Sequence, residues 1–144
     1  MAIGAEQLLV GLANAWQGSA ILERLVPGGL WSGEVPQTAL EPYAAITIKE
    51  ESVIMTATKD WIKTDLVEVR VYSSTPSDNT SRLEIANQIA ISWCSVPSSV
   101  TMASGSVMSI IPSSATAELV AERRDGEDML LVTLGYLAMT QGAY

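Results

Sequence analysis

The stretch WIKTDLVEVRVYS, residues 61–73, decides the fold class because its apolar and polar side chains alternate. Successive side chains of a β-strand point to opposite faces of a sheet, so this alternation predicts a strand that is buried on one face only. One face of the predicted strand holds three valines, Val67, Val69 and Val71. The other face holds Glu68, Arg70 and Tyr72. The sequence therefore predicts a sheet with one face in the core and one face toward solvent or a neighbouring subunit.

Two parts of the chain have helical periodicity. Residues 3–16 repeat apolar side chains along one stripe, and residues 21–26 continue the pattern until a Pro-Gly-Gly turn interrupts it. Residues 81–94 form the second apolar stripe, and Ser81 with Glu84 fits a capping box at its start. An apolar stripe must be buried against another element, and the sheet is the available partner.

Further strands are predicted on both sides of the second helix. Those before it cover residues 30–33, 43–48 and 52–57, the last as a hairpin arm. Those after it cover residues 107–111, 119–123 and 129–139, with an Asp125-Gly126 turn before the last. This order predicts an α+β fold in a single domain over residues 1–144, with a largely antiparallel sheet and two helices packed on one face. The other sheet face and the strand edges are left open to partners.

The four tryptophans separate into two pairs. Trp16 and Trp93 lie in the two apolar stripes and are predicted to anchor the core. Trp31 and Trp61 lie in or next to loops and are predicted interface residues, because tryptophan is enriched at buried interface positions. The single cysteine, Cys94, continues the second stripe and is predicted to be a buried, unreactive thiol.

Composition argues against several classes of function. The 144 residues carry a formal charge of −8, and the few basic residues do not cluster, so we expect no direct DNA or RNA binding and no docking on an anionic membrane. There is no histidine, which removes the commonest general base and metal ligand. No phosphate-binding loop or calcium loop is present. We therefore expect no enzyme activity, no cofactor and no metal, in a protein made in the cytosol without a signal peptide or membrane span.

One segment is more specific than the rest. In GGLWSGEVPQTALEPYAAITI, residues 28–48, a short strand leads into a loop with two prolines, and an alternating strand starts at an aromatic residue. This segment resembles the hallmark of the tail-terminator and tail-completion family of long-tailed bacteriophages, with Pro36, Pro42 and Tyr43 at the matching positions. The order of the later elements resembles that family as well, although the Ser-rich stretch of residues 97–117 is longer than its pattern requires.

The resemblance implies a virion structural protein at the tail or at the head–tail junction. Such a subunit forms a ring, often hexameric, that caps the tail tube, contacts the head-side connector and lets DNA pass through its lumen without specific binding. The alternative is a head-completion, adaptor or stopper protein of the neck, bound to the portal complex. For the ring-forming subunit, the predicted contact residues are Trp31, Glu34, Pro36, Pro42, Tyr43, Met55, Trp61 and Tyr72.

Overall fold

The five strands form one sheet in the order β1-β2-β3-β5-β4. The computed structural model describes residues 5–36, 39–55, 57–74, 79–95, 98–124 and 127–143. Its strands are β1 (Leu30–Trp31), β2 (Tyr43–Met55), β3 (Asp60–Ser74), β4 (Ser106–Arg124) and β5 (Glu127–Ala143). Strand β1 runs parallel to β2, and the other neighbours are antiparallel. The predicted α+β class with a largely antiparallel sheet is confirmed.

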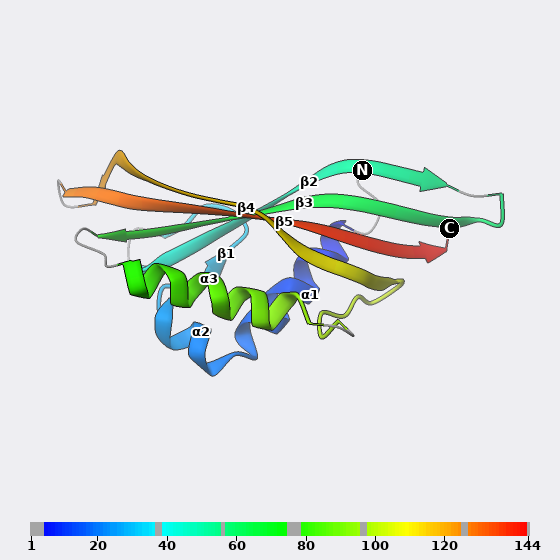
Figure 1. The fold of residues 1–144 in the computed structure, drawn as a ribbon, viewed down its shortest axis with the longest axis horizontal. Coiled ribbons are helices and arrows are strands. Elements are labelled where there is room, and N and C mark those ends of the chain that lie inside the picture. Colours follow the sequence, from blue (N-terminus) through cyan, green and yellow to red (C-terminus); the bar gives the residue numbers. More distant parts are fainter. Residues whose placement is uncertain are drawn as a thin grey trace.

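The helices are α1 (Ala5–Gln17), α2 (Ala20–Leu25) and α3 (Asn79–Trp93), and all of them lie on one side of the sheet (Figure 1). The opening helical segment divides in two at Gly18-Ser19, because the Ser19 hydroxyl accepts a hydrogen bond from the Leu22 backbone N–H at 3.2 Å and caps a new helix. Helix α3 begins at Asn79, before the predicted start. The capping role predicted for Ser81 concerns a side chain outside the described part of the chain.

The core lies between the helices and the valine face of β3. Val67, Val69 and Val71 are buried there, as the alternation predicts. Trp16 and Trp93 are also buried, with ring centroids 6.0 Å apart, and the Trp93 indole N–H donates to the Leu12 carbonyl at 3.1 Å. Both tryptophans are core anchors, so this part of the prediction is confirmed.

The number of strands differs from the prediction. Residues 43–48 and 52–57 were expected to be separate strands, but β2 is continuous to Met55 and takes up the irregularity as a bulge between Glu50 and Ser52. Residues 107–111 and 119–123 likewise belong to one strand, β4. That strand passes through Pro112 because it is the edge of the sheet, where a residue without an N–H costs no ladder bond on the open side. The predicted Asp125-Gly126 turn lies outside the described residues.

Candidate functional site

The predicted contact residues do not form one site. Tyr43 begins β2 and Met55 ends it, so at about 3.3 Å per residue the two lie about 40 Å apart. Trp31, Pro42 and Tyr72 are close to the Tyr43 end, since β1 pairs at Ala44 and Tyr72 pairs with Tyr43. Trp61 is opposite Met55 at the far end of the hairpin. The sequence therefore grouped residues that the sheet separates into two clusters.

The first cluster is built around two glycines. The Trp31 indole N–H donates to the Gly28 carbonyl at 2.7 Å, and the Gly28 N–H donates to the Pro42 carbonyl at 2.9 Å. Gly29 has φ +84°, a conformation that suits glycine, and its carbonyl accepts from the Ala44 N–H at 2.9 Å. These bonds hold the turn before β1 against the end of the proline-containing loop. These hydrogen bonds fix Trp31 at the edge of the sheet. We call the Gly28-Gly29 turn, together with the end of the loop at Pro42, the clamp.

Two other predicted contact residues, Glu34 and Pro36, lie in the loop after β1, and both are exposed. Pro42 is half-buried at the end of the same loop. Tyr43 and Tyr72 stack on each other with centroids 5.2 Å apart and an interplanar angle of 18°. Tyr72 has the opposite parity to the buried valines of β3, so this stack lies on the sheet face that the helices leave open. Aromatic side chains at an open face and edge are available to a neighbouring chain.

Substituting Gly28 with alanine tests the clamp. An added Cβ would meet the Leu40 carbonyl oxygen and come within 2.8 Å of the Pro42 carbonyl oxygen, both of them backbone atoms. We expect a destabilisation of about 1–3 kcal/mol, with increased hydrogen exchange at β1. Gly33, where an added Cβ meets nothing within 4 Å, provides the matched control. Equal unfolding free energies for Gly28→Ala and Gly33→Ala would show that the close backbone contact at Gly28 does not affect stability.

The structure corrects the prediction for Trp61. Its side chain is only 4% exposed, and its indole lies against Gly142 of β5. Trp61 has the same parity along β3 as the three buried valines, so the alternation that identified the core face also covers this residue. Its position next to a turn suggested an interface, but little of its surface is left for another chain. Met55, its partner in register, is exposed.

A buried ionic cluster on β3 was not predicted from the sequence. Lys63 and Asp65 are both fully buried, and Lys63 Nζ lies 3.3 Å from Asp65 Oδ1 and 3.5 Å from Glu50 Oε2 of β2. Burial raises the pKa of Asp65, while the Lys63 charge acts in the opposite direction. The period-2 pattern could have found this cluster, because Lys63 and Asp65 continue the parity of Val67.

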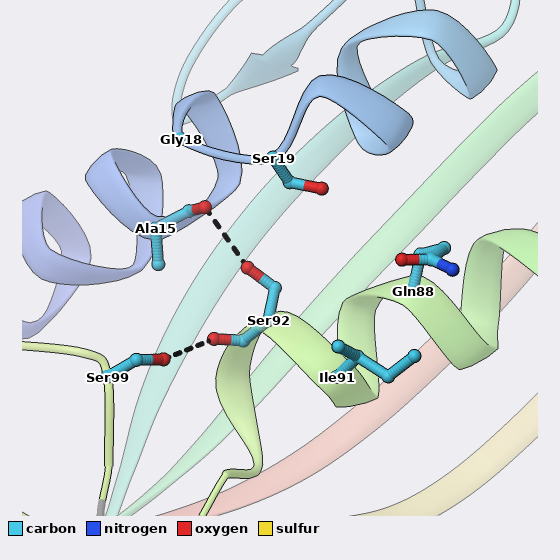
Figure 2. A pocket seen from close by; sticks show the side chains of 7 residues that line it. All are labelled: Ala15, Gly18, Ser19, Gln88, Ile91, Ser92 and Ser99. Atoms are coloured by element: carbon cyan, nitrogen blue, oxygen red, sulfur yellow. Dashed lines mark hydrogen bonds between the residues drawn. The ribbon is translucent and has the colours of Figure 1, made fainter.

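A shallow pocket of about 250 Å³ lies between α1, α3 and the loop after α3 (Figure 2). The Ser92 hydroxyl donates to the Ala15 carbonyl at 3.0 Å, and the Ser99 hydroxyl donates to the Ser92 carbonyl at 2.8 Å. A third hydroxyl at the pocket, that of Ser19, caps α2. The hydroxyls of this pocket are engaged in joining helices and loop, and none of the lining residues is ionisable: Ala15, Gly18, Ser19, Gln88, Ile91, Ser92 and Ser99.

Other chemistry is sparse in the described part of the chain. Within it, no group of three or more His, Cys, Asp or Glu side chains is arranged to hold a metal ion. None of its helices has the length and apolar character needed to cross a membrane. Cys94 is half-buried, and burial raises the pKa of its thiol, which favours the protonated and less nucleophilic form. The surface features that remain are the open sheet face, its edges and the clamped Trp31.

No protein-family model matches this sequence, and no curated protein matches it either. The fold does have counterparts among solved structures. A chain in the virion of a native gene transfer agent particle is similar to 99% of this chain over 100% of its own length, with a TM-score of 0.77 at 15% sequence identity. The two chains share the same fold from end to end.

Proposed function

We propose that this protein is a structural subunit of a phage-like virion. The observation that carries the proposal is the end-to-end fold match to a chain of a gene transfer agent virion, with no unmatched domain in either chain. The resemblance of residues 28–48 to the phage tail-terminator family supports the same conclusion independently of the structure. The clamp at Gly28 and Pro42 gives this segment a structural role, because its hydrogen bonds set the position of the sheet edge.

Within the virion, the role we propose is that of a tail terminator or tail-completion subunit. Copies of the chain would form a ring, by expectation hexameric, that caps the tail tube and contacts the head-side connector. The acidic balance, with a formal charge of −8, suits a lumen through which DNA passes without being retained, because exposed acids repel phosphates at close range. The subunit acts through assembly and not through catalysis.

Binding assays with purified virion components test the proposed role. The full chain is immobilised and offered the tail-tube protein and the portal complex of the same particle in separate experiments. We expect the immobilised chain to retain the tail-tube protein. When the gene is deleted, we expect heads and tails that do not join into complete particles. Retention of the portal complex alone would transfer the chain to a head-completion, adaptor or stopper position. Absence of the chain from purified particles by mass spectrometry would contradict a virion role altogether.

A further inference from the structure

A long stretch of the sequence has no charged residue. From residue 85 to residue 117 there is no Asp, Glu, Lys, Arg or His, so all 16 acidic and 8 basic residues lie outside it. This stretch contains most of α3, the loop after it and the first part of β4. Protein surfaces are normally rich in charge, whereas the buried centres of interfaces are depleted of it. A neutral stretch that reaches the surface therefore indicates a contact region.

The structure brings the two ends of this stretch together around one groove. The groove has a volume of about 330 Å³ and is almost entirely apolar, lined by Leu83 and Ala86 of α3, Ala115, Thr116 and Ala117 of β4, and Val132 and Leu134 of β5. Leu83 is 70% exposed beside it. None of the residues that line the groove is charged, and we call this groove together with residues 111–117 of β4 the neutral flank.

The opposite edge of the sheet has different chemistry. Trp31, 37% exposed, and Leu40, 64% exposed, both belong to the segment around Gly28 at this edge. The Gly28 carbonyl accepts a hydrogen bond from the Trp31 indole N–H, and the Gly28 backbone lies against the Leu40 carbonyl oxygen. Exposed acids flank this apolar pair, among them Glu34. In the strand order, β1 and β4 are the two outermost strands. Two exposed apolar residues and an apolar groove therefore lie at opposite edges of one sheet.

We propose that the neutral flank of one copy receives the β1 edge of the next copy, with Trp31 and Leu40 in the groove beside Leu83. This contact rests on the ring of the proposed function, and it specifies which surfaces of neighbouring copies meet. Copies that each carry a charge of −8 repel one another, and this repulsion is weakest where one of the two surfaces has no charge. A contact between two different edges is head-to-tail, the kind that closes into a ring when the rotation permits.

Charge insertion at exposed positions tests the two surfaces. Leu83→Glu and Ala115→Glu place an acid on the neutral flank, and Leu40→Glu places one on the β1 edge. Val10→Glu is the matched control, because Val10 is an apolar residue of α1 that is 53% exposed and lies outside both surfaces. Sedimentation velocity and native mass spectrometry measure self-association, and circular dichroism checks the fold. We expect Val10→Glu to assemble as the unchanged chain does, and the other three variants to associate at least about 10-fold more weakly.

A mixing experiment identifies the orientation. The Leu83→Glu chain keeps its β1 edge and the Leu40→Glu chain keeps its neutral flank, so an equal mixture should form heterodimers that cannot extend. A mixture that stays monomeric overturns the head-to-tail contact. Flank variants that assemble normally, or an unchanged chain that remains monomeric at the highest concentration reached, overturn the surface itself. Normal self-association together with loss of Leu83→Glu from particles would assign the flank to a different virion protein and also overturn the proposal.

The proposed contact surface and the proposed virion role can fail independently of each other. If the chain is present in particles but the flank variants assemble normally, the contact surface is wrong and the virion role stands. If the variants behave as expected but the chain is absent from particles, the contact stands and the virion role fails.

Discussion

Replacing Lys63 with methionine is expected to lower the free energy of unfolding by about 3–5 kcal/mol at neutral pH, because Asp65 would then be a buried carboxylate without its cation. Lys63 is fully buried, with Nζ 3.3 Å from Asp65 Oδ1. Methionine retains a flexible apolar stem, so the expected loss is mainly electrostatic. Urea unfolding followed by circular dichroism measures the difference between the variant and the unchanged protein.

The same substitution should make this loss depend on pH in a defined direction. Burial already raises the pKa of Asp65, and removing Lys63 takes away the interaction that lowers it. A carboxyl group whose folded pKa is raised contributes stability below its unfolded pKa of about 3.9, and this contribution is lost as the pH rises through the folded pKa. The destabilisation should therefore be smallest near pH ~4 and grow toward pH ~8. Taking the difference from the unchanged protein cancels the contributions of carboxylates that do not contact Lys63.

Two variants control this experiment. Lys49→Met removes an exposed lysine from the neighbouring strand and should change stability by no more than about 0.5 kcal/mol. Lys63→Met combined with Asp65→Leu should recover much of the loss, because apolar residues often replace a buried ion pair without cost. A double variant that is no more stable than Lys63→Met alone would show that the unpaired carboxylate is not the cause.

Replacing Trp93 with alanine should have a comparable effect for a different reason. Trp93 is fully buried, makes an edge contact with Tyr136 of the sheet at 5.4 Å and donates to the Leu12 carbonyl of α1 at 3.1 Å. Trp93 therefore links helices α1 and α3 to strand β5. Truncating a buried aromatic ring costs about 3–5 kcal/mol, a large part of the total stability of an ordinary domain, which is about 5–15 kcal/mol.

Trp93→Phe and Trp31→Ala are the informative comparisons. Phenylalanine keeps most of the ring contacts, so Trp93→Phe should cost less than Trp93→Ala. Trp31→Ala removes the same side chain from a partly exposed edge and should leave the unfolding transition closer to that of the unchanged protein. Circular dichroism is the appropriate probe, since the substitutions alter fluorescence. Equal losses for Trp93→Ala and Trp31→Ala would contradict the assignment of Trp93 as the core anchor.

Periodicity predicted much of the fold because it reports which side chains are buried. The valines of β3 and the tryptophans of the two apolar stripes, Trp16 and Trp93, were predicted from spacing alone and lie in the core, whereas Leu83 at the start of the second stripe is 70% exposed. The extent of β4 could not be predicted in the same way. Pro112 and its neighbouring serines have the composition of a loop, and only the position of β4 at the edge of the sheet makes them compatible with a strand.

The contact residues were less predictable than the core. A loop-flanking tryptophan can be buried by residues distant in sequence, and Gly142 buries Trp61 in this way. Likewise, the β1 end and the hairpin end of β2 belong to one strand but to two separate surfaces. The position of Lys63 beside Glu50 depends on the pairing of β2 with β3, which has a bulge that alternation does not reveal.

The pairing of β3 with β5 has a mechanical consequence. Its ladder runs through fifteen residue pairs from Asp60 to Ser74 with no shift, whereas the ladder of β4 with β5 shifts at three places. Interstrand hydrogen bonds lie perpendicular to the strands, so tension along the central pair is carried by all of its bonds at once in shear. The β4–β5 ladder, which the register shifts interrupt, would instead separate in shorter sections. The β3–β5 pair is therefore the stiff part of the sheet under tension, and the β4 edge is the part that yields more easily.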